Sequence, residues 1–187
     1  MKSKPKSKAK AKPKARAVSK KRALPIPAGF HTLTPYLVVR DGAKAVEFYQ
    51  KAFGAKVRSV HKTPDGKVMN ADLKIGDSIL MFSDEFPGLP GAGSPQTLGG
   101  TSVTVHIYVK DVDALFNQAL GAGAQVVMPV MDAFWGDRYG QLQDPFGHRW
   151  SIATHKEDLS AAEIAKRGEA VFAEMAKKAQ AAGQGAP

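Results

Sequence analysis

Two stretches of the chain decide its fold. Residues 34–57 read TPYLVVRDGAKAVEFYQKAFGAKV, and residues 104–126 read TVHIYVKDVDALFNQALGAGAQV. At a spacing of seventy residues, the matching pairs are Thr34 with Thr104, Leu37 with Ile107, Val39 with Val109 and Asp41 with Asp111. Two copies of one supersecondary unit are the simplest explanation of this match.

Each copy begins with an alternating, β-rich run and continues with a helical period. Asp41 and Asp111 stand where an N-cap accepts hydrogen bonds from free backbone N–H groups, and Gly54 and Gly123 stand where a glycine ends a helix. Three further strands are expected after each helix, at 55–61, 67–75 and 78–83 in the first copy and at 125–131, 138–143 and 148–154 in the second. The sequence therefore predicts an α+β domain of two tandem βαβββ modules.

The length of 187 residues suits one domain with appendages. The expected boundaries are a Lys-rich tail and Pro linker at 1–28, module one at 31–83, a linker at 84–100, module two at 101–156, and a C-terminal helix and tail at 158–187. The two modules together make one domain at 29–157. A capping box at Ser160 and Glu163 begins the last helix, which is expected to pack on the domain or on a partner subunit.

The net charge of +10 resides in the N-terminal tail. Residues 1–23 hold eleven of the 27 Lys and Arg and no acid, so the remainder carries sixteen basic against seventeen acidic residues. Such a tail has too few apolar side chains to fold, and we expect it to be disordered. Contact with nucleic acid through residues 1–23 is one expectation, and a solvated tail that aids solubility is the alternative.

Composition also excludes several classes of chemistry. The chain has no cysteine, which rules out disulfides, thiolate nucleophiles and cysteine-ligated zinc. No run approaches the ~20 apolar residues that a spanning helix needs, and no signal peptide is recognisable. We therefore expect a soluble cytoplasmic protein with no membrane partner.

The paired modules, the run AVEFYQKAFGA and the segment WGDRYGQLQDPFGHRWSIATHKED together resemble the vicinal oxygen chelate superfamily. That superfamily includes glyoxalase I, extradiol dioxygenases and bleomycin-resistance proteins, and the second segment resembles its PhnB-like, or glyoxalase-like, branch. The resemblance implies a curled, partly closed mixed sheet with the helices outside. It also implies a ligand site in the cavity between the modules, often within a homodimer.

Metal enzymes of this superfamily take their ligands from the first and last strands of each module. The resemblance places Thr34, Leu80, Thr104 and Ser151 at those positions, and none of them is an imidazole or a carboxylate. We therefore expect no metal and no other cofactor. A displaced divalent-metal site that uses His106 and Asp72 is the alternative.

Strand alternation predicts which side chains face the cavity. Val105, Ile107 and Val109 suit the helix side, so His106 and Tyr108 are expected to face the cavity. In module one the same parity directs Met69, Ala71 and Leu73 to the helix and leaves Asn70 and Asp72 at the cavity. His106 beside Asp72 could act as a general base, or it could be a hydrogen-bonded wall residue.

Other side chains could bind a ligand. Aromatic residues could stack on a planar molecule and arginines could pair with its anionic group, although core packing and solvation are the ordinary roles of these residue types. The candidates for ligand binding are Tyr36, Asn70, Tyr108, Trp135, Arg138, Arg149 and Ser151.

Three functions remain in competition, in this order. The first is small-molecule binding without catalysis, as in the bleomycin-resistance proteins that the chain resembles. The second is a lyase or isomerase with His106 or Asp72 as the base. The third is nucleic-acid association through the tail.

Overall fold

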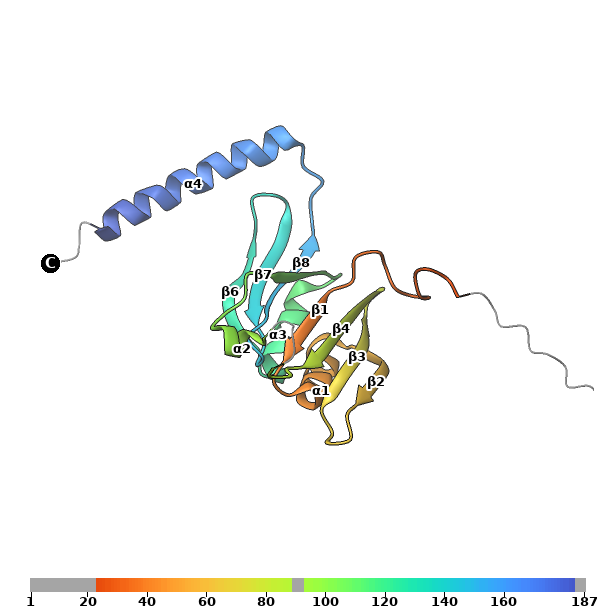
Figure 1. The fold of residues 1–187 in the computed structure, drawn as a ribbon. Helices are drawn as coiled ribbons and strands as arrows, with labels where there is room; N and C mark the ends of the chain where they lie inside the picture. The colour runs from red at the N-terminus through yellow and green to blue at the C-terminus, as the bar shows by residue number, and fades with distance from the viewer. Residues whose placement is uncertain (1–22, 89–92, 184–187) are drawn as a thin grey trace, which may run out of the picture.

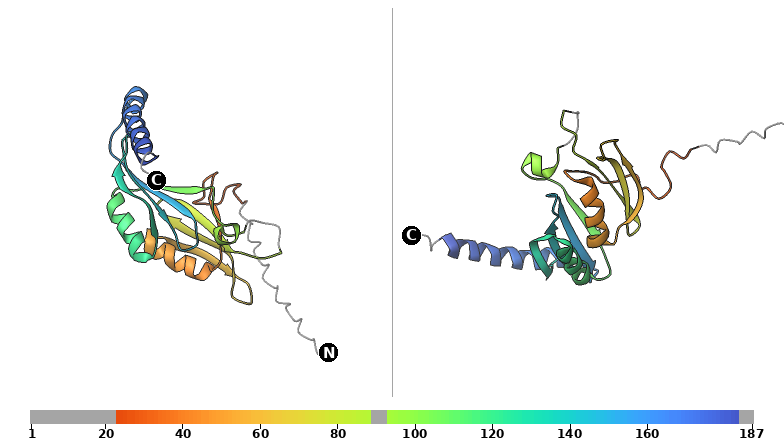
Figure 2. Two further views of the ribbon diagram at one scale, coloured as in Figure 1. Left: turned by 90° about the vertical axis from the view of Figure 1, so that its left-hand side faces the viewer. Right: turned by 90° about the horizontal axis from the view of Figure 1, so that it is seen from below.

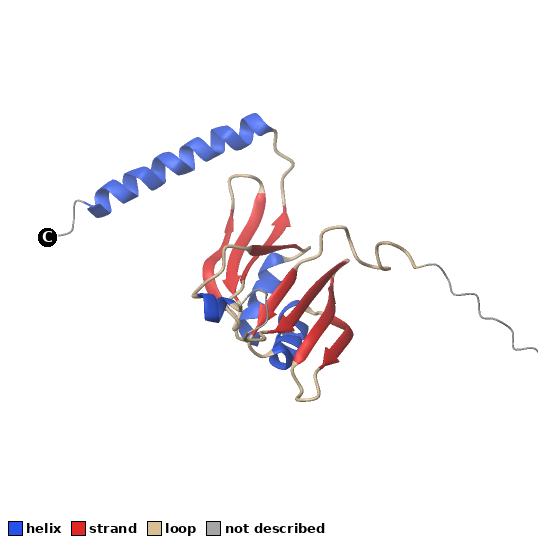
Figure 3. Cartoon of the chain, in the orientation of Figure 1, coloured by secondary structure: helices blue, strands red, loops and turns tan. Residues whose placement is uncertain are grey.

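The computed structural model describes residues 23–88 and 93–183. The predicted nucleic-acid-binding tail lies almost entirely outside these residues and stays a prediction. The elements in chain order are β1 (Tyr36–Val39), α1 (Gly42–Phe53), β2 (Lys56–Lys62), β3 (Val68–Ile75), β4 (Ser78–Asp84), α2 (Pro95–Leu98), β5 (Thr104–Tyr108), α3 (Val112–Ala122), β6 (Gln125–Asp132), β7 (Asp137–Gln143), β8 (Arg149–His155) and α4 (Ala161–Gly183). The predicted α+β class with two βαβββ modules is confirmed (Figures 1 and 3).

The eight strands form two mixed, open sheets of four strands each. The strand order is β1-β4-β3-β2 in module one and β5-β8-β7-β6 in module two. The first and last strands of each module pair in parallel, and the other pairs are antiparallel. Tyr36 lies opposite Met81, and His106 lies opposite Ser151, so both partners are shifted by the same seventy residues. The duplication therefore extends to the register of the sheets.

Both long helices of the modules begin and end as predicted. The Asp41 side chain accepts a hydrogen bond from the Lys44 backbone N–H at 3.0 Å, and that of Asp111 accepts one from Ala114 at the same distance. Gly54, with a φ of 62°, ends α1 in the left-handed conformation that glycine adopts without strain. Local capping chemistry thus fixes the helix ends in each module.

The two helices pack against each other on one side of the sheets (Figure 2). Tyr49 of α1 is fully buried, and its hydroxyl donates to the Asp144 carboxylate in the β7–β8 turn at 2.8 Å. His148 donates from Nε2 to the Val38 carbonyl oxygen at 3.0 Å. These two bonds tie a turn of module two to the helix and the first strand of module one.

The predicted alternation of β3 is wrong at the start of the strand. Ala71 and Leu73 are fully buried as expected, but Met69 is 56% exposed and Val68 takes the buried place. The pairing of β2 with β3 shifts between His61 and Lys62, and such a bulge reverses the parity of the residues beyond it. Val68 then packs beside the start of α1, where a Cβ on Gly42 would lie 2.6 Å from the Val68 Cβ.

Helix α4 extends away from the modules (Figure 1). Its capping box is present: the Glu163 carboxylate accepts from the Ser160 backbone N–H at 3.0 Å. Phe134, in the β6–β7 turn, contacts it through the Phe172 ring, with the ring centroids 5.7 Å apart. Among the described residues, no helix is both long and apolar enough to span a membrane.

Candidate functional site

The face of the second sheet that points away from α3 gathers polar and aromatic side chains. The strand register arranges it in three rows, which we call the module-two face: Thr104–Arg149–Gln143, His106–Ser151–Gln141 and Tyr108–Ala153–Tyr139. Because side chains alternate along a strand, the apolar residues between these rows point to the helix side. The alternation of β5 noted in the sequence therefore produces this face directly.

His106 occupies the middle row of the module-two face. Its Nδ1 lies 2.7 Å from the Ser151 Oγ on the neighbouring strand. Burial lowers the pKa of His106 below the ordinary value of 6.5, and the Asp137 carboxylate offsets part of that shift. The imidazole is therefore neutral at pH 7 and can both accept and donate a hydrogen bond.

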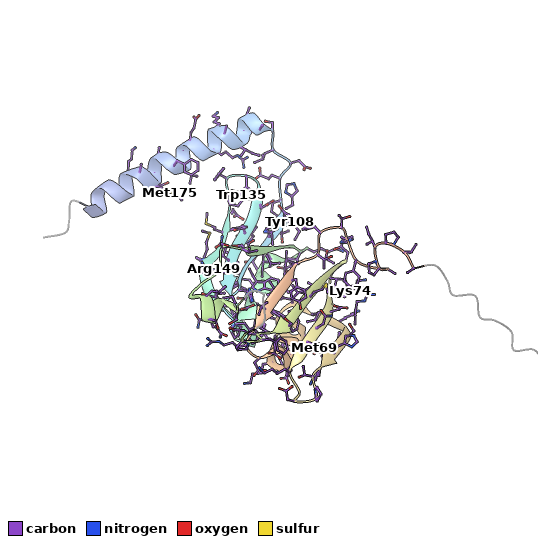
Figure 4. The ribbon with its side chains drawn as sticks, in the orientation of Figure 1. Met69, Lys74, Tyr108, Trp135, Arg149 and Met175 are labelled. Atoms are coloured by element: carbon purple, nitrogen blue, oxygen red, sulfur yellow. The ribbon has the colours of Figure 1, made fainter. Side chains whose placement is uncertain are left out.

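Aromatic rings surround this imidazole. The Tyr108 ring packs edge to face against His106 with centroids 4.5 Å apart, and Tyr139 lies nearly parallel to it at 6.1 Å. Trp135, in the β6–β7 turn, packs edge to face against Tyr139 at 5.3 Å. Figure 4 shows Trp135 and Tyr108 toward the same end of the second sheet. This arrangement offers flat apolar surfaces beside a polar group.

Asp137 fixes the orientation of three of these groups. It is 4% exposed, and its carboxylate accepts from Tyr108 Oη at 3.0 Å, Trp135 Nε1 at 3.0 Å and His155 Nδ1 at 2.7 Å. Burial acts to raise the pKa of Asp137, but hydrogen bonds from His155, Tyr108 and Trp135 outweigh burial and leave that pKa below its ordinary value. The charged Asp137 carboxylate therefore holds the Tyr108 and Trp135 rings in place.

His155 forms the outer end of this network. Its Nε2 lies 3.0 Å from the Asp158 carboxylate, in addition to the bond to Asp137. The hydrogen bonds to Asp137 and then Asp158 raise the pKa of His155 above 6.5. The two histidines near the module-two face thus have pKa values shifted in opposite directions.

A cavity of about 690 Å³ adjoins this face between the modules. Module one contributes Leu33, Pro35 and the β3–β4 turn, and module two contributes Val105, Ile107 and Val109 from the helix side of β5. His106 and Tyr108 also line it. The cavity is mainly apolar, and its polar residues include two predicted site residues.

The candidates from module one lie apart from this cluster. The Asp72 carboxylate accepts from Ser59 Oγ at 2.9 Å and from Asn70 Nδ2 at 2.8 Å, all within the first sheet. Tyr36 is 50% exposed on β1. His106 was expected beside Asp72, but the acid near its ring is Asp137, because the two modules form separate sheets.

The two candidate arginines lie on opposite faces of the second sheet. Arg138 pairs across β7–β8 with Thr154, whose hydroxyl accepts from the Val112 backbone N–H at the start of α3. Its guanidinium contacts the Asp113 carboxylate at 2.6 Å, on the helix side and away from the module-two face. Arg149 lies on the module-two face, partly buried and toward the other end of the sheet from Trp135 (Figure 4).

The residues at the superfamily's metal positions do not fit a divalent cation. Leu80 is buried in the core at 3% exposure, and Ser151 is bonded to His106. Thr34 donates its hydroxyl to the His31 carbonyl oxygen at 3.0 Å. Within residues 23–88 and 93–183, no three His, Asp or Glu side chains come together in a way that could hold a metal ion.

Sequence reasoning missed three members of the cluster: Tyr139, Gln141 and the Asp137 carboxylate as their neighbour. Gln141 donates from Nε2 to the Tyr139 hydroxyl at 2.6 Å. The alternation Asp137-Arg138-Tyr139-Gly140-Gln141 could have indicated all three, since odd positions share one face. Asp137 begins β7, and its carboxylate bonds three side chains.

Comparisons with known proteins identify relatives of this chain. The family described as "Glyoxalase/Bleomycin resistance protein/Dioxygenase superfamily" matches residues 29–152. Uncharacterized protein Mb0911c of Mycobacterium bovis is 47% identical over 134 residues, which cover 71% of this chain and 88% of that protein. The family match spans both modules.

Solved structures share the fold. TioX from Micromonospora sp. ML1 is 30% identical, with a TM-score of 0.54 over 66% of this chain and 97% of that one. A Bacillus cereus structure described as a putative 3-demethylubiquinone-9 3-methyltransferase, PhnB protein, is 18% identical, with a TM-score of 0.52 over 66% of this chain and 99% of that one. At that identity, the second structure indicates the fold alone.

Proposed function

Because this chain belongs to the glyoxalase/bleomycin resistance protein/dioxygenase superfamily, we propose that it binds a small planar molecule at the module-two face and the adjoining cavity. One observation carries the proposal. His106 and Tyr108 belong both to the aromatic cluster and to the lining of the cavity of about 690 Å³. A ligand can therefore bury an apolar part in the cavity and place a polar edge at the imidazole.

The geometry favours binding over catalysis. Tyr108 and Trp135 already donate their polar hydrogens to Asp137, so they offer ring surfaces to a ligand. The remaining polar groups near the rings include the neutral imidazole of His106 and the Ser151 and Gln141 side chains. These groups can orient a ligand by hydrogen bonds.

Titration tests this proposal. Trp135 lies in the cluster, so quenching of tryptophan fluorescence by a panel of planar aromatic compounds should report binding. We expect His106→Ala to weaken binding by about tenfold, because a hydrogen bond of about 1.4 kcal/mol is lost. His31→Ala is the matched control, since His31 is exposed and lies ahead of β1. Equal affinities of wild type and His106→Ala would contradict the proposal.

A second function rests on the lowered pKa of His106. A neutral imidazole can take a proton, so a lyase or isomerase with His106 as the base is the alternative. Asp72 is a weaker candidate because its carboxylate already accepts from Ser59 and Asn70. Product analysis during the titrations separates the two functions: turnover that His106→Ala abolishes supports the enzyme, and binding without product supports sequestration.

We also propose that two copies assemble through the outer edges of β1 and β5. Each is the end strand of its sheet in the described chain, and unpaired strand edges favour association. Val103, just ahead of β5, is 62% exposed. Val103→Lys should convert a dimer to monomer in light scattering, whereas Val126→Lys at the opposite edge strand should not. A monomeric wild type would contradict this assembly.

A further inference from the structure

One arginine differs from all the others that the structure describes. Four of the five are held by partners: Arg40 by Glu85 and Thr97, Arg58 by the Ala28 carbonyl oxygen and the Phe30 ring, Arg138 by Asp113 and Asp132, and Arg167 by Glu157. Arg149 has no hydrogen bond, ion pair or ring contact among the residues that the structure describes. It is nevertheless partly buried.

The position of Arg149 links it to the proposed site. It is the first residue of β8 and shares a row of the module-two face with Thr104 and Gln143. It precedes Ser151 by two residues on the same face, so its Cα lies about 7 Å along the strand from that of the serine bonded to His106. A guanidinium on a long side chain can reach a group bound beside the imidazole.

The charge of Arg149 is not balanced from within the module-two face. The acid nearest the rings, Asp137, accepts from Tyr108, Trp135 and His155. Its carboxylate is thus occupied by other donors. The Arg149 guanidinium has no partner of its own and is in contact with solvent, so it is available to an anion from outside. A planar guanidinium binds carboxylate, sulfonate or phosphate groups through two parallel hydrogen bonds.

We propose that Arg149 forms an anion subsite of the module-two face, so that the ligand is an amphipathic anion. Its planar part lies against His106 and the neighbouring rings, and its acidic group pairs with the Arg149 guanidinium. This inference rests on the proposed function and narrows the ligand class: a planar molecule with one acidic group is preferred over its neutral counterpart.

Two fluorescent probes test the subsite: 8-anilinonaphthalene-1-sulfonate and N-phenyl-1-naphthylamine, which has the same rings without the sulfonate. Wild-type protein should bind the sulfonate more tightly, and only that affinity should fall as salt is added. Arg149→Gln should weaken sulfonate binding by about tenfold and the neutral probe by less than about twofold. Arg167→Gln, which removes an arginine on α4, is the matched control and should change neither.

Arg149→Lys guards against a folding defect, because it keeps the charge and a long side chain. It should retain most of the preference for the sulfonate, and both variants should melt within a few degrees of wild type. Equal weakening of both probes in Arg149→Gln would make Arg149 structural and overturn the subsite. Unchanged sulfonate binding would overturn the subsite while leaving the proposed function intact. If neither probe bound the wild type, the proposed function and the subsite would fall together.

Discussion

The two modules share a framework and differ on their open faces. In both modules an aspartate caps the helix. In both, a side chain near the end of the last strand also accepts a hydrogen bond from the first backbone N–H group of the helix. Asp84 accepts from the Gly42 N–H at 2.7 Å, and Thr154, seventy residues later, accepts from the Val112 N–H at 2.9 Å. The positions that fix helix and strand geometry have thus kept the same roles.

The open faces, which point away from the helices, have not kept the same roles. Where module two has His106 and Ser151 side by side, module one has Tyr36 and Met81 at the equivalent positions. The aromatic cluster and the Asp137 network occur in module two, whereas the first sheet has the smaller network around Asp72. The comparison teaches that the framework can be kept while the open face changes, and the second sheet carries the face at which we propose that the ligand binds.

The largest effect is expected on stability, at a buried carboxylate in the β7–β8 turn of module two. The Asp144 carboxylate accepts from Tyr49 and Trp150 and from the backbone N–H groups of Phe146 and His148. Asp144→Ala leaves these buried donors unpaired and should cost about 4 kcal/mol or more of unfolding free energy. Tyr49→Phe removes one of the bonds and should cost about 1–2 kcal/mol. Urea denaturation measures both, and equal losses would contradict the central role of Asp144.

The next prediction compares the equivalent helix supports. Asp84 accepts from two backbone N–H groups, those of Gly42 and Val68, whereas Thr154 accepts from one. Asp84→Ala should therefore cost about 3 kcal/mol, and Thr154→Val about 1–2 kcal/mol. Denaturation of the two variants under the same conditions checks the order, and a larger loss for Thr154→Val would break the comparison.

A smaller effect, on the affinity for a ligand, should distinguish the open faces of the two sheets. Tyr108→Ala removes a ring that contacts His106 and should weaken N-phenyl-1-naphthylamine about five- to tenfold. Tyr36→Ala removes a ring of module one that is not among the residues lining the cavity of about 690 Å³, and it should change the affinity less than about twofold. A larger loss in Tyr36→Ala would place the site on the first sheet.

The smallest effect is the pH dependence of stability. The raised pKa of His155 stabilises the fold below pH 6.5, and this contribution is lost as pH rises through the folded-state pKa above that value. The lowered pKa of His106 acts oppositely, since its contribution is present above pH 6.5 and is lost as pH falls below it. His155→Gln should flatten the alkaline side of the melting-temperature profile, and His106→Gln the acidic side.

The fold was predictable because its causes are local or repeated. Helix caps, glycine stops and strand alternation act over a few residues, and the seventy-residue match aligned both modules. Parity also placed His106 and Tyr108 together on one face of β5. Parity was wrong for Met69 because the bulge between β2 and β3 depends on how two strands pair, which alternation within one strand does not reveal.

The sequence by itself determined the duplicated modules, their helix ends and the side chains that alternate on β5. Only the tertiary structure decided that Asp137 joins Tyr108, Trp135 and His155, and that Arg149 alone of the described arginines lacks a partner. The physical reason is the separation along the chain of the residues that interact. Helix caps and strand alternation depend on residues that are neighbours in the sequence. Ion pairs and networks depend on strands and turns brought together by the packing of the whole sheet.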